Sequence, residues 1–234
     1  MKNETMNKSL SGDSHLAQLA LKIKDRESDC HLNKRIALIA CGALAREMIA
    51  IKEKHRLDVT LFCAPALLHN YPHKIPDAIR KRIGKLREQF DHLIIVYGDC
   101  GTGEMLDAML EEEGVQRIAG PHCYEMYAAE KFDGLMQEEL GTFFLTDYMV
   151  RSFDHLVIEG LGLDEHPELR DDYFGRYKRV VYLAQTDDAH LLLKAQRAAE
   201  SLRLPLEVRH TGYGALEQRL LELISRSKRN EAQL

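Results

Sequence analysis

Short apolar runs alternate with amphipathic segments along most of the chain, and this alternation constrains the fold more than any other feature. The apolar runs have the length and composition of buried strands: Arg35–Ala40, Val59–Phe62, His92–Tyr97, Arg179–Ala184 and Leu206–Arg209. The segments between them, such as Ala43–Lys54 and Leu191–Leu202, repeat apolar residues at helical spacing. Strands that alternate with helices predict an α/β fold whose parallel sheets are covered by helices.

The alternation also contains a self-similar pattern. Three stretches each read as a strand, a small-residue loop, a helix, a second strand, a second loop and a second helix: Ile36–Asn70, Leu93–Ala128 and Arg179–Glu217. We therefore predict three repeated βαβα units, which a pseudo-threefold axis could relate. The alternative is the ordinary punctuation of a doubly wound sheet, because a strand followed by glycine and a helix recurs in any such fold.

The length of the chain and the composition of its ends set the expected domain organisation. A chain of 234 residues, 45% of them hydrophobic, can bury a core without disulfide bonds. Polar, charged segments flank the alternating body. We expect an N-terminal polar tail over residues 1–33, a single α/β domain of three repeated units over 34–226, and a C-terminal tail over 227–234.

Charge and cysteine content narrow the class of protein. The net charge of −5 argues against a nucleic-acid binder and against binding to an anionic membrane surface. No apolar run approaches the roughly 20 residues of a membrane span, and the first 33 residues show no apolar core of a secretory signal. Five cysteines, an odd number, are typical of a reducing, cytoplasmic compartment with thiols that are free or bound to metal.

Three cysteines follow predicted strands, where parallel-sheet proteins place their ligand sites. Cys41, Cys100 and Cys123 each have a glycine or histidine as a neighbour. Three thiolates suit a zinc ion or an iron–sulfur cluster, and they leave a fourth position open to a small molecule. The alternative is that each is a small buried residue, as free cysteine commonly is. We expect Cys30, in the N-terminal tail, and Cys63, at the end of an apolar strand, to be incidental.

Polar neighbours of these cysteines are the candidates for catalysis. Asp99 precedes Cys100 and His122 precedes Cys123, so each could transfer a proton beside a thiolate. The alternative roles are structural, because an aspartate can cap a helix and His122 can occupy the first turn of one.

A glycine-rich loop and the third unit supply the candidates for binding a cofactor or small molecule: Gly101, Thr102, Gly103, Gln185 and Tyr213. Glycines let backbone N–H groups approach a ligand, although a tight turn between strand and helix would also require them. The third unit has no cysteine, so we expect its polar residues to bind the small molecule rather than the metal. The repeat would also aim His69 toward the same centre.

Several motifs, in order along the chain, resemble one known family. They are APALLHNYPHKIP, YGDCGTG, RIAGPHCYE, GTFFLTDYMVRSFD, GLGLDEHPELRDDYF, VYLAQTDD and TGYG. Together they resemble the family called domain of unknown function 1638, over about residues 36–217. The resemblance implies a single bacterial or archaeal cytoplasmic domain. It also suggests an accessory role beside a corrinoid protein or methyltransferase, since genes of the family often lie near those of corrinoid-dependent methyltransferases; it implies no direct binding of corrinoid. Leu140 stands where the family pattern has proline.

These observations lead to three hypotheses. The first is a thiolate-bound iron–sulfur or zinc protein that acts on a small molecule and serves corrinoid-dependent methyl transfer. The second is a non-catalytic accessory protein that binds a cofactor or a partner without metal. The third is a metal-free enzyme with Cys100 as its nucleophile, although the sequence contains no complete Cys-His-acid signature.

Overall fold

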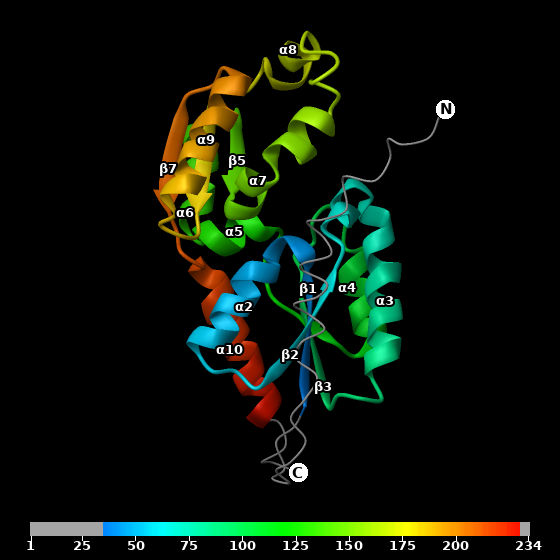
Figure 1. The fold of residues 1–234 in the computed structure, drawn as a ribbon. Coiled ribbons are helices and arrows are strands. Elements are labelled where there is room, and N and C mark those ends of the chain that lie inside the picture. Colours follow the sequence, from blue (N-terminus) through cyan, green and yellow to red (C-terminus); the bar gives the residue numbers. More distant parts are fainter. Residues whose placement is uncertain (1–34, 230–234) are drawn as a thin grey trace, which may run out of the picture.

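A computed structural model describes residues 35–229, which form two parallel β-sheets covered by helices (Figure 1). The predicted α/β class with parallel sheets is therefore confirmed. The first sheet has the strand order β2-β1-β3-β4 and the second has the order β5-β6-β7. We call the two sheets, with the helices that cover them, the first and second lobes.

The first sheet is built around β1 (Ile36–Cys41), which is buried along its whole length. It pairs with β2 (Val59–Ala64) and β3 (His92–Val96), and β4 (Gln116–Arg117) extends the sheet at its edge. Because both faces of β1 are covered, its sequence IALIAC is apolar throughout instead of alternating.

Four helices cover this sheet: α2 (Ala45–Lys54), α3 (Ile75–Leu86), α4 (Met105–Glu113) and α10 (Gly214–Arg229). Figure 1 shows α3 and α4 on one face of the sheet and α2 and α10 on the other. The C-terminal helix α10 follows the second sheet in the chain but returns to the first lobe, where Leu216, Leu220 and Ile224 join the core. These residues recur at helical spacing, so one face of α10 is apolar. Short helical turns η1 (Gly42–Leu44), η2 (Ala66–Asn70) and η3 (Pro72–Lys74) follow β1 and β2.

The second sheet consists of β5 (Thr142–Thr146), β6 (Arg179–Ala184) and β7 (Leu206–His210). Its central strand β6 contributes to two cores, because Val180 and Tyr182 face one core while Val181 and Leu183 face the other. Five helices and one π-helical turn complete the lobe and its connection to the first: α5 (Cys123–Ala128), α6 (Lys131–Glu138), α7 (Asp147–Arg151), η4 (Asp154–Glu159), α8 (Leu169–Phe174) and α9 (Ala189–Leu202).

Helix α9 shows how local sequence determines an element of this lobe. The Asp188 carboxylate accepts hydrogen bonds from the backbone N–H groups of His190 and Leu191 and so caps the first turn. One face of the helix is buried through a leucine and alanine stripe: Leu191, Ala195, Ala198, Ala199 and Leu202. The helix ends where Arg203 adopts a left-handed conformation.

The predicted threefold repeat is not confirmed. The first two units lie side by side in the first sheet, whereas the third lies in the second sheet. There it pairs with β5, a strand that belongs to none of the predicted units. The tails predicted over residues 1–33 and 227–234 lie largely outside the described residues, although α10 continues to Arg229.

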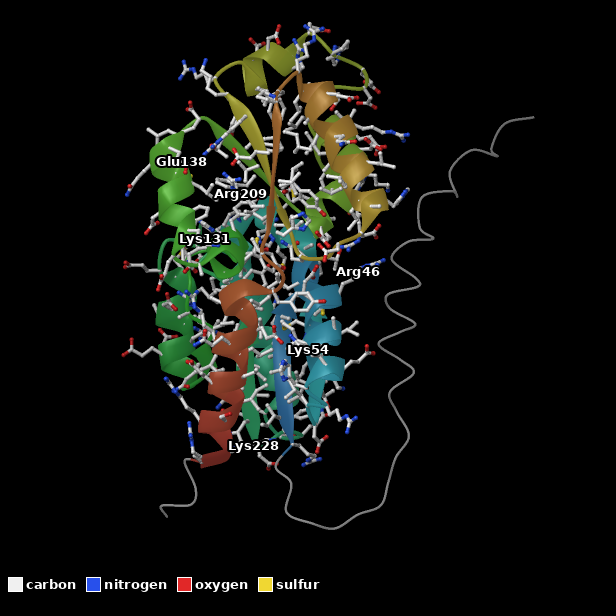
Figure 2. All side chains as sticks on the ribbon, turned by 90° about the vertical axis from the view of Figure 1, so that its left-hand side faces the viewer. Arg46, Lys54, Lys131, Glu138, Arg209 and Lys228 are labelled. Atoms are coloured by element: carbon white, nitrogen blue, oxygen red, sulfur yellow. The ribbon has the colours of Figure 1, made fainter. Side chains whose placement is uncertain are left out.

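Charged side chains lie on the outer surfaces of the helices. Figure 2 shows Lys54 on α2, Lys131 and Glu138 on α6, and Lys228 on α10 pointing away from the sheets. Arg209 lies on the edge strand β7, where a charged side chain disfavours pairing with another sheet. No helix in the described part of the chain is long and apolar enough to cross a membrane.

Candidate functional site at the carboxyl ends of the strands

The site begins at the point where the strand order of the first sheet reverses. The chain passes from β1 to β2 on one side and then returns to β3 on the other side of β1. Loops that leave adjacent strands in opposite directions at such a point leave room for a ligand beyond the carboxyl ends. Cys41 ends β1, and Tyr97 directly follows β3. The two residues that flank the reversal are therefore a thiol and a phenol.

The loop after β1 places Cys41 against His69. Gly42 lies so close to the loop after β2 that a Cβ atom there would stand 2.8 Å from the Ala64 carbonyl oxygen. Glycine is thus required for the two loops to meet. His69 Nδ1 donates to the Ala66 carbonyl oxygen at 2.9 Å and lies 3.9 Å from the Cys41 Sγ atom. The Cys41 thiol also accepts a hydrogen bond from the Ala43 N–H at 3.3 Å.

The loop after β3 brings Cys100 and Cys123 to the same place. A Cβ atom on Gly98 would lie 2.8 Å from both the Pro121 carbonyl oxygen and the His122 Cα atom. The Cys100 N–H donates to the Pro121 carbonyl oxygen at 2.8 Å. Cys100 itself has a φ of +49°, an unfavourable conformation for a residue with a side chain. The backbone of this loop is therefore held in place by the chain segment that precedes Cys123.

Mutual effects on pKa agree with these loop contacts in placing the three predicted cysteines near one another. Burial raises the pKa of the Cys123 thiol, and the charges of Cys100 and Cys41 raise it further. Burial opposes protonation of His69, but contacts with Cys100 and Cys41 outweigh that effect and raise its pKa above the ordinary value. A sulfur that accepts a hydrogen bond from the imidazole favours its protonated form.

Tyr97 is the buried aromatic residue of this group. It is fully buried, and its ring stacks on that of His69 with centroids 5.7 Å apart. Its hydroxyl makes no hydrogen bond of good geometry within the described residues, although the Cys41 thiol is close enough to interact with it. Burial raises the pKa of Tyr97, and nearby Cys41 raises it further. We call Cys41, His69, Tyr97, Cys100 and Cys123 the thiol cluster.

Among residues 35–229, no group of three or more His, Cys, Asp or Glu side chains is arranged to hold a metal ion as it stands. Cys63 lies near Cys41, and burial raises its pKa to about 11, which makes it a poor thiolate. Cys30 lies outside the described residues.

The two predicted catalytic residues have local structural partners. Asp99 accepts hydrogen bonds from the Thr102 hydroxyl and from the Glu104 N–H, the latter at 3.1 Å, and the Thr102 bond is the main cause of its lowered pKa. His122 Nδ1 accepts the Glu125 N–H at 3.3 Å, as a helix cap does. Burial lowers the pKa of His122, whose ring lies against Phe132. Their catalytic roles stay predictions.

The residues predicted to bind a cofactor or small molecule differ in how free their polar groups are. In the glycine-rich loop Gly101, Thr102, Gly103, the Thr102 hydroxyl and the Gly103 N–H both point to Asp99. Gln185 is buried, and its amide is engaged by the Asp147 N–H at 2.7 Å and by the Leu183 carbonyl oxygen. Tyr213 is half-buried. Tyr213 is therefore the residue of this set with the most side chain exposed to a ligand.

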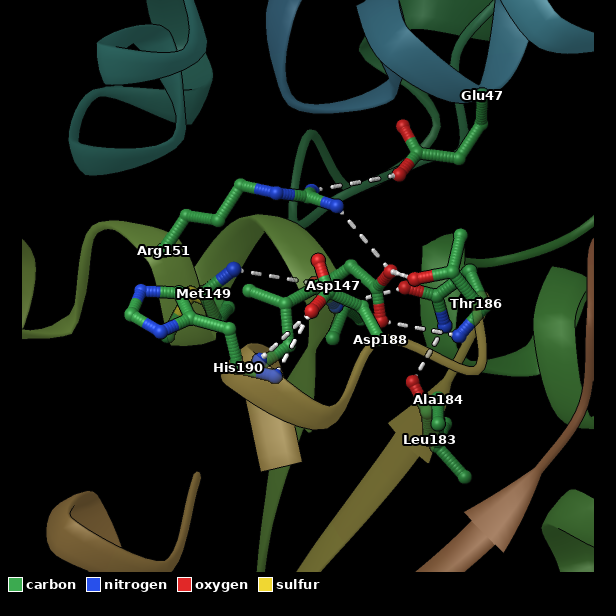
Figure 3. Close-up of polar contacts among 12 residues, drawn as sticks. Glu47, Asp147, Met149, Arg151, Leu183, Ala184, Thr186, Asp188 and His190 are labelled. Atoms are coloured by element: carbon green, nitrogen blue, oxygen red, sulfur yellow. Dashed lines mark hydrogen bonds and ion pairs between the residues drawn. The ribbon is translucent and has the colours of Figure 1, made fainter. Parts of the chain in front are cut away.

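A second group of polar residues, of which the sequence indicated only Gln185, lies at the carboxyl ends of the second sheet (Figure 3). Asp147, fully buried, directly follows β5. Its carboxylate accepts hydrogen bonds from Tyr182 at 2.7 Å, the Gln185 N–H at 3.0 Å, Thr186 at 2.6 Å and Arg151 at 3.2 Å. An aspartate directly after an apolar strand was the available signal, but it required recognising β5.

The carboxyl ends of the two sheets face each other, and one contact spans them. Arg151 of the second lobe reaches toward Glu47 of α2 in the first lobe, with Nη1 and Oε1 3.9 Å apart (Figure 3). Buried Tyr127 lies within electrostatic reach of both groups: burial raises its pKa well above the ordinary value, and the charges of Glu47, Cys123, Asp147 and Cys41 add to that rise. The thiol cluster and the Asp147 group therefore belong to one region.

The fold and the site define an α/β protein of two parallel sheets with a thiol cluster at the facing carboxyl ends of its strands. A family model described as a protein of unknown function (DUF1638) matches residues 63–220, and the chain belongs to that family. The match includes His69, Cys100 and Cys123 but begins after Cys41. No curated protein and no solved structure matches the chain.

Proposed function

We propose that the protein binds a zinc ion or an iron–sulfur cluster through Cys41, Cys100 and Cys123, and acts on a small molecule held beside that metal. The observation that carries the proposal is a set of loop contacts: His69 lies 3.9 Å from the Cys41 Sγ atom and stacks on Tyr97, and the Cys100 N–H bonds the segment that precedes Cys123. The mutual effects of the thiols on pKa agree with these contacts.

The donor set has the chemistry that such a metal requires. Three thiols and an imidazole are soft to borderline ligands that suit zinc or an iron–sulfur cluster. His69 lies beside the thiols, and its Nδ1–H donates to the Ala66 carbonyl oxygen. A histidine ligand commonly binds metal with one nitrogen while the other donates to a carbonyl in this way. The loops would move slightly inward on binding, since the side chains do not yet stand at ligand distances.

Other residues of the region would act on the bound molecule. In this proposal Asp99 and His122 hold or transfer protons near the thiols, and Tyr213, which packs against the core of the first lobe, contacts the small molecule. The glycine-rich loop and Gln185 would shape the site through their backbone and their hydrogen bonds. The biological setting that we propose is cytoplasmic and accessory to corrinoid-dependent methyl transfer, with a corrinoid protein or methyltransferase as partner.

Metal analysis of protein purified without oxygen tests the proposal. We expect zinc, or iron with acid-labile sulfide, at about one site per chain. Cys41→Ser, Cys100→Ser and Cys123→Ser should each lose most of it, because serine is a harder and poorer ligand. Cys63→Ser is the matched control and should keep the wild-type amount.

Equal metal in the wild type and in Cys100→Ser would contradict the proposal. A wild-type chain free of zinc and iron would also contradict it, and would leave the metal-independent binding protein as the better hypothesis.

A further inference from the structure

Glu47 and Arg151 form an incomplete pair between the lobes. The Glu47 side chain is only 4% exposed, yet its Oε1 atom lies 3.9 Å from Arg151 Nη1, beyond hydrogen-bond distance. Its second oxygen, Oε2, is buried and has no partner among the described residues. A buried carboxylate oxygen without a hydrogen bond is costly, so native proteins rarely leave one unless a ligand or water completes it.

Two other pairs in this chain show what a complete arginine–carboxylate contact looks like. Arg117 donates to both oxygens of Asp107, at 2.5 and 2.7 Å. Arg219 donates to both oxygens of Glu125, at 2.6 Å each. Both are two-pronged contacts of the strong kind. The long, one-sided contact of Glu47 is therefore a local feature of the region between the lobes.

Asp147 fixes the guanidinium of Arg151 without using up its donors. The only hydrogen bond that Arg151 makes within residues 35–229 goes to Asp147 Oδ2 at 3.2 Å. The other acceptor positions of Asp147 are filled by Tyr182, Thr186 and the Gln185 N–H. Asp147 is thus a positioning residue, and the remaining N–H groups of Arg151 are left for another acceptor.

A ligand that pairs with both Arg151 and Glu47 must carry two groups of opposite charge close together. It needs an anionic acceptor for the free N–H groups of Arg151 and a cationic donor for the unpaired oxygen of Glu47. A free amino acid has a carboxylate and an ammonium group one carbon apart and supplies both.

We propose that Glu47 and Arg151 bind the zwitterionic head of an α-amino acid, with its carboxylate on Arg151 and its ammonium on Glu47. The side chain of that amino acid would then lie toward Tyr127 and the thiol cluster, which share the same region. The site uses no cysteine, so it does not depend on a bound metal.

Burial adjusts the charge of Glu47 in keeping with this role. It raises the pKa of Glu47, and a hydrogen bond from the residue's own backbone and the attraction of Arg151 offset that rise only in part. An ammonium group placed on Oε2 would restore the charged form by direct pairing.

Calorimetric titration of the full chain with each of the twenty L-amino acids tests the proposal, with acetate and methylammonium as probes that carry half of the head group. At least one amino acid should bind the wild type more tightly than about 10 mM, and more tightly than either half probe. Arg151→Gln and Glu47→Gln should each weaken binding at least about tenfold. The control Arg80→Gln, which removes an exposed ion pair with Glu112, should bind as the wild type does.

No binding by any of the twenty amino acids would overturn the proposal, as would binding that survives Arg151→Gln in a chain whose circular dichroism is unchanged. If Arg151→Gln fails to fold, Arg151→Lys keeps the positive charge beside Asp147 but loses the planar fork, and it should still weaken binding. Glu47 and Arg151 supply all the contacts to the head group, so wild-type protein without metal should still bind the amino acid. A metal-free chain that binds an amino acid would thus refute the proposed metal site alone.

Discussion

Both sheets have polar residues at the carboxyl end of a strand. The two sets differ in how completely their polar groups are hydrogen-bonded. After β5, the Asp147 carboxylate accepts hydrogen bonds from four donors. After β3, the buried hydroxyl of Tyr97 makes no hydrogen bond of good geometry within the described residues, beside thiols with few hydrogen bonds. A saturated group holds structure together, whereas an unsaturated group at a strand end is available to a ligand.

The largest effect is expected on the saturated side. Asp147→Ala removes the acceptor of four buried or half-buried donors and leaves the Arg151 charge without its partner. We expect a loss of about 3–5 kcal/mol in the free energy of unfolding, measured by urea denaturation. A loss below about 1 kcal/mol would mean that the Asp147 group is not the structural centre of the second lobe.

A smaller effect is expected where two loops touch in the thiol cluster. Gly98→Ala places a Cβ atom 2.8 Å from the backbone of Pro121 and His122, which cannot move aside as a flexible side chain could. We expect about 1–3 kcal/mol of destabilisation from this overpacking. The loop that holds Cys100 should also shift, so metal content should fall. Gly134→Ala is the control, because a Cβ atom there meets nothing within 4 Å and alanine favours helix.

Two glutamates should respond to pH with opposite sign. Burial raises the pKa of Glu47 above its value in the unfolded chain, so its stabilising protonated form is present at low pH and lost as pH rises through the folded pKa. Arg46, Asp147 and Arg151 face it. Glu47→Gln should therefore be more stable than the wild type at pH 8. The gain in stability should be smaller than the loss caused by Gly98→Ala, and it should shrink as pH falls toward 5.

Glu125 provides the opposite case. Its hydrogen bonds with Arg219 lower its pKa, so its contribution is present above the unfolded pKa and lost as pH falls through the folded one. Glu125→Gln should be less stable than the wild type at pH 8 and should approach it in acid. Urea denaturation across this pH range measures both variants, and the same sign of pH dependence in the two would refute the assignment of their environments.

The smallest effect distinguishes two buried tyrosines. Tyr97→Phe removes a hydroxyl that makes no hydrogen bond of good geometry within the described residues, and we expect the free energy of unfolding to stay within about 0.5 kcal/mol of the wild type or to rise. Tyr182→Phe removes a hydroxyl that donates to Asp147 at 2.7 Å and should cost about 1–2 kcal/mol. Thermal unfolding of the two variants side by side measures the difference, and equal costs would remove the contrast between the two strand ends.

Much of the fold could be predicted from local sequence pattern. The strand at Arg179–Ala184 has the predicted bounds, and the other four predicted strands match observed ones to within two residues at either end. The strand β5 was missed because its apolar run, Phe143–Leu145, is only three residues long between two threonines. A run of that length does not distinguish a strand from a turn. Missing β5 led to the threefold arrangement, since the second sheet contains one strand more than the repeat supplies.

Only part of the candidate site could be predicted, because local sequence does not show which contacts the folded loops make. Cysteines that directly follow strands could be placed at one sheet edge, because parallel strands end together. Asp99 and His122 were equally visible in the sequence, but only the folded loops position the Thr102 hydroxyl and the backbone N–H groups that bond them. Glu47 gave no signal, as a glutamate in an amphipathic helix is usually exposed.

The sequence by itself determined where strands and helices alternate and which residues stand at the strand ends, because periodicity and glycine placement act over a few neighbours. It also carried the family resemblance, which the family match over residues 63–220 confirms. Only the tertiary structure decided that α10 returns to the first lobe and that the carboxyl ends of the two sheets face each other. That facing brings Glu47 within 3.9 Å of Arg151, about a hundred residues along the chain. Contacts of this kind depend on how whole lobes pack, and no local pattern of side chains encodes them.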